Sequence, residues 1–186
     1  MKQSQITYWC HTILRSQIKP EGIYVDATMG NGKDTLFLCR LAGTEGHVWA
    51  FDIQTQALET TKALLSENDC IQRATLILDG HENMDRYLSS ETADAICFNF
   101  GYLPGGNHSI ATRWDTSLKA VQKGLDILKP GGMMSLCIYS GGDTGFEERE
   151  FILKFLKELP ADKYTVILNE YYNRGNHPPL PVFVFK

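Results

Sequence analysis

An acidic, glycine-containing segment has the strongest potential for chemistry in this sequence. It spans residues 25–35, VDATMGNGKDT, between an expected strand over residues 23–27 and an expected helix over residues 33–41. Gly30 and Gly32 allow a tight turn and let backbone amides approach a ligand closely. In open α/β sheets, ligands bind at this position, outside the carboxyl ends of the strands. The segment therefore predicts a ligand-binding loop.

The residues around the glycines separate two classes of nucleotide ligand. A dinucleotide fingerprint has Gly or Ala three residues after its second Gly, where this sequence has Thr35. A pyrophosphate would also meet the carboxylates of Asp26 and Asp34, whereas the ammonium and sulfonium of S-adenosylmethionine (SAM) are attracted to them. The segment favours SAM as the cofactor, and an NAD-dependent dehydrogenase is the weaker enzymatic alternative.

Two further strand ends supply candidate cofactor residues. Asp52 ends the expected strand over residues 47–53, where its oxygens could accept hydrogen bonds from both ribose hydroxyls, a feature that NAD enzymes share. The segment Asp79-Gly80-His81 follows the expected strand over residues 75–78, where class I methyltransferases usually hold adenine. For Asp79 the alternative is a helix cap, with Glu82 three residues later. The candidate cofactor-binding residues are Asp26, Met29, Gly30, Asn31, Gly32, Asp34, Thr35, Asp52, Gln54, Gly80 and His81.

A second motif, NFGYLPGG at residues 99–106, follows the expected strand over residues 93–98. Many methyltransferases that modify nitrogen have Asn or Asp and then Pro-Pro-Tyr at this position. The Asn99 carbonyl can accept a hydrogen bond from an amine and direct its lone pair at the methyl group, and Tyr102 can stack on a base. We expect Asn99 and Tyr102 to be catalytic. The alternatives are a turn-forming residue for Asn99 and simple packing for Tyr102.

These motifs require parallel strands that alternate with helices. Such a pattern predicts an α/β fold, a Rossmann-like class I methyltransferase with a mostly parallel seven-stranded sheet and a C-terminal antiparallel hairpin. We expect a single domain over residues 1–186, with an N-terminal helix in residues 1–22 packed on it. Beyond the elements given above, we expect helices over residues 5–18, 54–66, 82–88, 112–128 and 146–159, a stop signal at 129–132, and strands over 133–139, 164–171 and 182–185.

The overall composition limits the choice of partners and compartment. The 186 residues carry a net charge of −4, so a purely electrostatic grip on nucleic acid is disfavoured, although a local basic patch is compatible with it. The five cysteines are scattered and four lie among apolar neighbours, which indicates reduced, buried thiols and a cytoplasmic protein. The sequence has no signal peptide and no run of ~20 apolar residues, so no membrane partner is expected. The five histidines lack metal-ligand spacing, so no metal is expected.

Over essentially its whole length the sequence resembles small bacterial class I methyltransferases known as rRNA methylases. This family includes the tRNA enzyme that methylates 5-aminomethyluridine at wobble position 34. The resemblance rests on His11, the DATMGNG string at residues 26–32, the motif at residues 99–106, and the loop from Asn173 to Pro179. It implies SAM as the cofactor and transfer of a methyl group to the aminomethyl nitrogen of uridine 34.

The resemblance implies a tRNA anticodon stem-loop as partner, with an unstacked base read by stacking and edge contacts. The candidate substrate-binding residues are His108, Arg113, Arg174, Asn176 and His177; for each, a solvated surface position is the alternative. His108 is also a candidate proton acceptor. Methylation of ribosomal RNA or of a small amine, a non-catalytic SAM-binding module, and a homodimeric assembly all stay open at this stage.

Overall fold

The computed structural model describes residues 6–101, 112–139, 142–176 and 178–186. The helices are α1 (Ile6–Gln17), α2 (Lys33–Ala42), α3 (Thr55–Glu67), α4 (Trp114–Ile127) and α5 (Gly142–Lys157), with 3-10 helices η2 (Ile71–Arg73) and η3 (His81–Arg86). The strands are β1 (Ile23–Asp26), β2 (His47–Asp52), β3 (Ala74–Leu78), β4 (Ala93–Phe100), β5 (Leu128–Ile138), β6 (Thr165–Leu168) and β7 (Leu180–Phe185). Helices and strands alternate as the sequence predicts.

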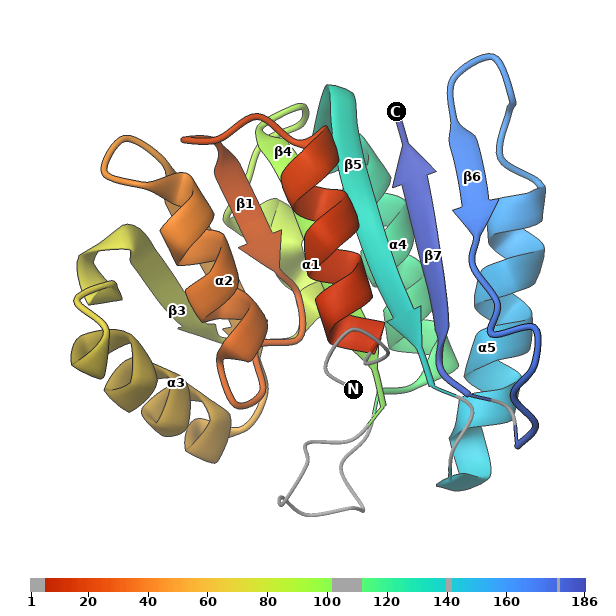
Figure 1. Cartoon of the computed structure of the whole chain (residues 1–186), viewed down its shortest axis with the longest axis horizontal. Helices are drawn as coiled ribbons and strands as arrows, with labels where there is room; N and C mark the ends of the chain where they lie inside the picture. Colours follow the sequence, from red (N-terminus) through yellow and green to blue (C-terminus); the bar gives the residue numbers. More distant parts are fainter. Residues whose placement is uncertain (1–5, 102–111, 140–141, 177) are drawn as a thin grey trace.

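The strands form one seven-stranded sheet in the order β3-β2-β1-β4-β5-β7-β6 (Figure 1). The first five strands of the chain are parallel, whereas β7 is antiparallel to both β5 and β6. The expected fold class is therefore confirmed. The chain winds outward from β1 to β3 and then returns to place β4 on the other side of β1. This reversal opens a crevice at the carboxyl ends of β1 and β4, where ligands bind in such folds.

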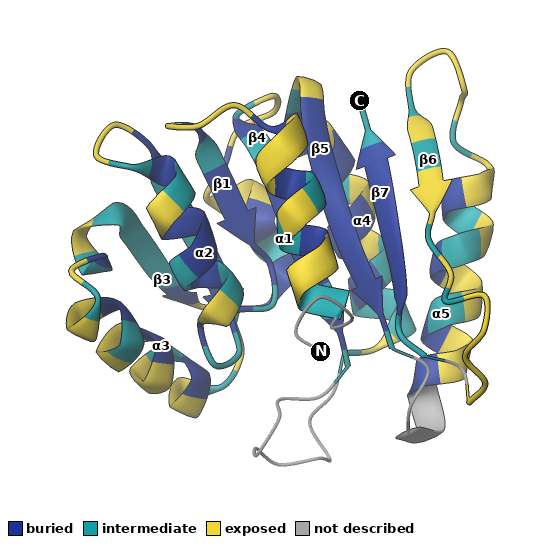
Figure 2. Cartoon of the chain, viewed as in Figure 1, coloured by how far each residue is buried: buried dark blue, intermediate teal, exposed yellow. Residues whose placement is uncertain are grey.

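Helices cover both faces of the sheet and create two apolar cores. One core joins α1, α2 and α3 to the sheet, and the other joins α4, α5 and η3 to its opposite face. Neighbouring strand residues alternate between the cores: Tyr24 and Met133 face α1 and α2, while Val25 and Met134 face α4. Figure 2 shows β1, β5 and β7 buried, and the outer side of α1 exposed. The central strands are thus fixed on both faces.

The boundaries of the later elements differ from the prediction. The helix stop expected at residues 129–132 is confirmed, since α4 ends at Ile127, but the expected strand start at residue 133 is wrong: β5 begins at Leu128, which pairs with Ala93 of β4. The register with β4 is irregular between Leu128 and Met133, and Gly131 has a left-handed φ of 79°. The amide of Gly131 nevertheless donates to the carbonyl of Lys186 at 2.7 Å, and the amide of Lys186 donates to the carbonyl of Gly132 at 3.1 Å. A pairing partner at the far end of the chain thus extends the strand through a segment whose Pro and Gly favour a turn.

Helix α5 begins at Gly142 rather than at residue 146, and β6 covers only Thr165–Leu168 of the expected residues 164–171. The expected burial of the cysteines is confirmed, since all five are buried free thiols. Within the residues that the structure describes, no helix has the length and apolar character needed to cross a membrane.

Candidate active site

The loop after β1 has a conformation that requires glycine. Gly30 and Gly32 have φ angles of 51° and 74°, in the left-handed region that disfavours side chains. A Cβ atom on Gly32 would also lie 2.6 Å from Oγ1 of Thr61. The Thr61 hydroxyl donates to the carbonyl of Gly30 at 3.1 Å. Helix α3 therefore packs directly on this loop and fixes its path into α2.

Asp26 anchors the same loop from the end of β1. It is fully buried and accepts hydrogen bonds from Oγ1 of Thr35 at 2.6 Å and from the amide of Thr28 at 3.2 Å. Burial, followed by the nearby charge of Asp34, raises the pKa of Asp26 to about 7. Asp26 thus ties the loop to the first turn of α2, and its direct contact with the cofactor stays a prediction.

Asp52 joins the end of β2 to the glycine loop. Its Oδ2 accepts a hydrogen bond from the amide of Gly30 at 2.9 Å, and its Oδ1 accepts one from the amide of Gln54 at 2.9 Å. A carboxylate has about four lone-pair sites, so both oxygens retain acceptor capacity. The side chain is half-buried at the crevice. This geometry leaves Asp52 able to bind a pair of hydroxyls beside the loop.

Two apolar side chains lie exposed beside Asp52. Ile53 follows Asp52 in the chain and is 62% exposed. Leu78, the register partner of Asp52 on β3, is 51% exposed. Exposed large apolar groups at the mouth of a crevice fit a planar ring such as adenine. Neither residue was among the candidates from sequence, because each looked like an ordinary end of a buried strand. Periodicity alone does not show which apolar strand ends lie outside the core.

Asn99 is held by two elements other than its own strand. Its amide nitrogen Nδ2 donates to Oδ2 of Asp34 at 2.8 Å, and its backbone amide donates to Oγ1 of Thr28 at 2.7 Å. The nitrogen side of the amide is therefore turned toward α2. The carbonyl oxygen Oδ1 consequently points away from Asp34 and keeps its acceptor capacity. Asp34 and Asn99 are 65 residues apart in the chain, yet their hydrogen bond brings Asn99 next to the glycine loop.

Asp34 receives a second hydrogen bond from the N-terminal helix. Nε2 of His11 lies 2.8 Å from Oδ1 of Asp34, and the His11 ring stacks on Phe37 with centroids 3.8 Å apart. Burial alone would raise the pKa of Asp34, but the hydrogen bond and charge of His11 and the hydrogen bond from Asn99 lower it below its usual value. Asp34 is therefore an ionised carboxylate with both oxygens in use.

His81, predicted to bind the cofactor, is buried at the start of η3. Its Nδ1 lies 3.2 Å from the carbonyl of Ala27, so this nitrogen donates, and Phe98 and Phe100 contact the ring edge-on. Burial lowers the pKa of His81, which favours the neutral ring. His81 thus links η3 to the glycine loop.

The structure does not support the helix-cap alternative for Asp79, because Gly80 is the N-cap residue of η3 and no side chain caps it. Its Oδ1 accepts hydrogen bonds from the amide of Gly80 at 2.7 Å and from Nδ2 of Asn83 at 2.8 Å, and its Oδ2 accepts one from Tyr87 at 3.0 Å. A Cβ on Gly80 would lie 2.3 Å from the carboxylate of Glu82, which is the end of a flexible side chain. Asp79 therefore fixes the start of η3 beside the crevice.

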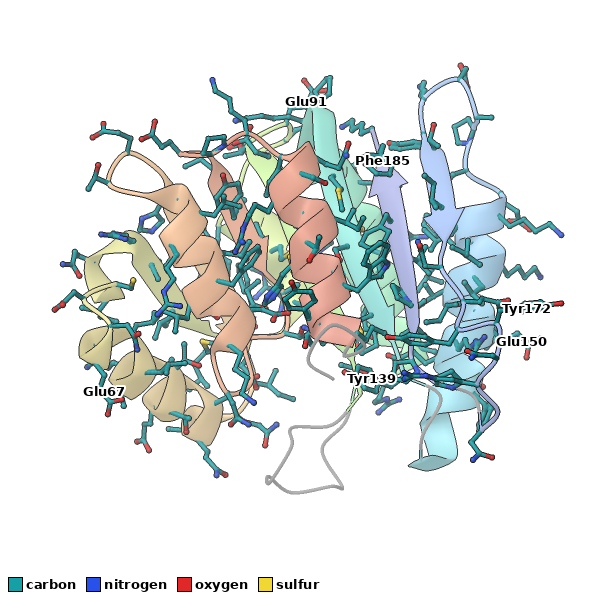
Figure 3. The ribbon with its side chains drawn as sticks, viewed as in Figure 1. Glu67, Glu91, Tyr139, Glu150, Tyr172 and Phe185 are labelled. Atoms are coloured by element: carbon teal, nitrogen blue, oxygen red, sulfur yellow. The ribbon has the colours of Figure 1, made fainter. Side chains whose placement is uncertain are left out.

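A buried glutamate fixes the base of the segment that follows β4. The Thr112 hydroxyl accepts a hydrogen bond from the amide of Gly101 at 2.8 Å and donates to Glu148 at 2.9 Å, while Ser117 donates to Glu148 at 2.5 Å. Tyr139, labelled in Figure 3, lies beside Gly101 at the same edge of the sheet. Residues 102–111, which include Tyr102 and His108, lie outside the described residues. Thr112 therefore joins the two ends of this segment, and Glu148 of α5 holds Thr112 in place.

The remaining predicted substrate residues lie at the carboxyl edge of the sheet. Arg113 is exposed and its Nε lies 3.3 Å from Oδ1 of Asp115. The guanidinium of Arg174 lies 4.4 Å from the ring centroid of Tyr171, and Asn176 is exposed with a φ of 63°. His177 lies outside the described residues. Since β7 begins opposite the end of β5, the segment with Arg174 lies at the same edge as the end of β4.

Among the described residues, no three His, Cys, Asp or Glu side chains lie close enough together to bind a metal ion. The site is instead built from hydrogen-bonded carboxylates, one amide and a glycine loop. Such groups can bind hydroxyls and amines and can hold an acceptor in a fixed direction.

Comparison with known proteins identifies the family of this chain. Residues 48–185 match the model of a family described as "Putative rRNA methylase". The chain is 36% identical to "tRNA (mnm(5)s(2)U34)-methyltransferase, chloroplastic" of Arabidopsis thaliana, over 99% of this chain and 70% of that protein. The chain belongs to the rRNA methylase family.

Two solved structures share the fold of this rRNA methylase family member over nearly the whole chain. One is a "putative rRNA-methylase" from Clostridium thermocellum, with a TM-score of 0.92, 44% identity and 95% of each chain covered. The other is a "putative methyltransferase" from Streptococcus mutans in complex with SAH, with a TM-score of 0.87, 38% identity and 97% of each chain covered. The family resemblance seen in the motifs is confirmed.

Two residues of this rRNA methylase family member have structural roles that the sequence did not predict. The sequence points to His11 only as part of the family pattern, and it gives no sign of a role for Glu148. A buried, hydrogen-bonded position for Glu148 cannot be distinguished in sequence from a solvated helix position, because its partners Thr112 and Ser117 are 36 and 31 residues away. For His11, the sequence shows only a histidine within an expected helix, which does not indicate its partner Asp34.

The raised pKa of Asp26 makes the stability of the fold depend on pH. Between an unfolded pKa of about 3.9 and the folded pKa of about 7, the native state binds more protons than the unfolded state, so the wild-type free energy of unfolding falls as pH rises. We expect Asp26→Asn, which does not titrate, to gain stability relative to wild type through this window and to show a constant difference above it. Urea denaturation at a series of pH values measures this difference. A difference that is flat between pH 4 and 7 would contradict the assigned pKa.

Proposed function

We propose that this chain is a SAM-dependent N-methyltransferase that acts on tRNA. Its substrate is the aminomethyl group of 5-aminomethyluridine, with or without a 2-thio group, at wobble position 34. The product is the 5-methylaminomethyl form. The partner is the anticodon stem-loop of the tRNA.

The orientation of the Asn99 amide is the observation that carries this proposal. Because Nδ2 donates to the ionised carboxylate of Asp34, Oδ1 is left to accept a hydrogen bond from a substrate amine. A primary amine that donates one N–H to Oδ1 and the other to the following backbone carbonyl would have its lone pair in a fixed direction, which is what an in-line methyl transfer needs. A hydroxyl acceptor would gain less, since it has a single hydrogen to hold. The geometry favours nitrogen as the methylated atom.

The crevice residues fit SAM by their chemistry. Asp52 retains acceptor capacity for the ribose hydroxyls, and the exposed Ile53 and Leu78 flank the position of a planar base. The glycine loop lies beside them and leads to Asn99 through Thr28. SAM supplies an electrophilic methyl group on a sulfonium. The residues of this chain bind the cofactor, orient the amine and keep the Asn99 amide from rotating.

Relatives support RNA as the substrate class. The family description names rRNA, and the Arabidopsis relative is named for the modified uridine at tRNA position 34. An anticodon loop presents an unstacked base at its wobble position, which a protein can reach without opening a duplex. The aminomethyl nitrogen of that base is the amine that the Asn99 carbonyl would hold.

The cofactor assignment predicts an effect of Asp52→Asn. The substitution replaces one acceptor oxygen by a donor and removes the charge, so we expect SAM binding to weaken by about 1–3 kcal/mol. Asp69→Asn is the matched control, because Asp69 is an exposed residue after α3, at the other end of the strands. Titration calorimetry measures both affinities. Unchanged SAM affinity in Asp52→Asn, or tighter binding of NAD than of SAM, would refute the assignment.

The amine-orienting role predicts a selective loss of rate. We expect Asn99→Ala to lower turnover by at least tenfold while SAM affinity changes little, because the residue acts on the acceptor and not on the cofactor. The exposed Gln72, before β3, offers a matched control in Gln72→Ala, which removes an amide at the opposite edge of the sheet. Near wild-type turnover of Asn99→Ala on tRNA would exclude the role.

The substrate assignment is tested directly with tRNA. Purified enzyme and SAM should convert 5-aminomethyluridine in tRNA to its methylaminomethyl form, detected as the gain of one methyl group by mass spectrometry of the nucleosides. Activity should fall as salt is added, since phosphate contacts weaken with ionic strength. If the enzyme ignores this tRNA and methylates ribosomal RNA or a small amine, the substrate claim fails and the methyltransferase claim stands.

A further inference from the structure

A basic groove lies between α1 and α2, on the sheet face opposite α4. Its volume is about 280 Å³, and its lining includes four nitrogen-bearing side chains, namely His11, Arg15, Lys33 and Arg40. The aromatic ring of Phe37 lies among them. The two helices are neighbours on the same face of the sheet, as Figure 1 shows. No carboxylate contributes to this lining.

Of the four nitrogen-bearing side chains of the groove, His11 is paired with Asp34. The other three, Arg15, Lys33 and Arg40, form no ion pair within the described residues. Arg40 donates instead to the neutral Oδ1 of Asn68 at 2.8 Å, and the guanidinium of Arg15 lies 5.5 Å from the ring centroid of Phe37. All three basic side chains are exposed. In a chain with a net charge of −4, such a groove is a local attraction for anions.

A chain of hydrogen bonds links the groove to the candidate active site. His11 lines the groove and is hydrogen-bonded to Asp34, which in turn holds the amide of Asn99. Lys33 begins α2 at the carboxyl edge of the sheet, and Arg40 lies two turns farther along this helix, a rise of about 10 Å. The basic groups therefore extend from the crevice along one face of the molecule.

We infer that this groove binds the phosphate backbone of the RNA strand next to the methylated nucleotide. The inference rests on the proposed function, which brings a nucleotide to Asn99. Phosphates follow one another along a strand, and Arg15 and Arg40 each present a planar fork of donors that matches a phosphate. An RNA strand that enters the crevice would place its neighbouring phosphates along the groove. The groove is a binding surface distinct from Arg113 and Arg174, which lie at the ends of β4 and β6.

The double substitution Arg15→Gln with Arg40→Gln tests the groove. The probe is an unmodified anticodon stem-loop RNA, and fluorescence anisotropy gives its Kd at a series of salt concentrations. Loss of two phosphate contacts should weaken binding by roughly 10–30-fold near 0.1 M salt and reduce the slope of log Kd against log salt by about 1.4. The matched control is Lys154→Gln with Lys157→Gln, which removes the same charge from exposed positions of α5, on the opposite face of the sheet. SAM affinity of both double variants should equal that of wild type, which confirms that they fold.

Three results would overturn the inference: an unchanged Kd and salt slope in the groove variant, an equal loss in the α5 control, or no binding of the RNA by the wild-type protein. Failure of the proposed function gives a different result. If the wild-type protein binds RNA through the groove but leaves 5-aminomethyluridine unmethylated, the substrate assignment is wrong and the groove assignment stands.

Discussion

The carboxylate of Asp34 is the interaction on which the arrangement of the site depends. It lies in the first turn of α2, and its two oxygens are used by His11 of α1 and by Asn99 at the end of β4. A buried charge is costly unless it is hydrogen-bonded. Moving any of the three elements would leave that charge short of a partner. Helix α1, the first turn of α2 and the end of β4 are therefore held in one geometry.

Much of the fold could be predicted because its signals are local. Short apolar runs, helices with one apolar side and glycine or proline punctuation indicate the parallel core from β1 to β4 without reference to distant residues. The start of β5 could not be predicted in this way. Pro130 and Gly131 favour a turn locally, yet the segment pairs with Lys186 at the other end of the chain. Pairing with the far end of the chain, which local patterns do not show, extends the strand back through this segment.

The same contrast between local signals and contacts of distant residues applies to the site. The glycine loop, Asp52 and Asn99 follow from residue types at strand ends, because the fold brings those ends to one edge. What the sequence could not show is how each group is used. Asp26 has the appearance of a ligand, yet both of its oxygens face Thr28 and Thr35. Glu148 has the appearance of a surface residue, yet it is buried under two hydroxyls. Such roles depend on partners tens of residues away.

The charges of the molecule are separated in a way that suits a substrate of mixed charge. The crevice gathers the carboxylates of Asp26, Asp34 and Asp52, while the adjoining groove presents Arg15 and Arg40. A nucleotide with an aminomethyl group combines a cationic amine with anionic phosphates. In the proposed complex, carboxylates near the crevice would attract the amine and the sulfonium, and the groove would attract the backbone, each over distances of about a Debye length. The small negative net charge is therefore compatible with the proposed RNA binding, since the sign of the field at each part of the substrate matters more than the sum.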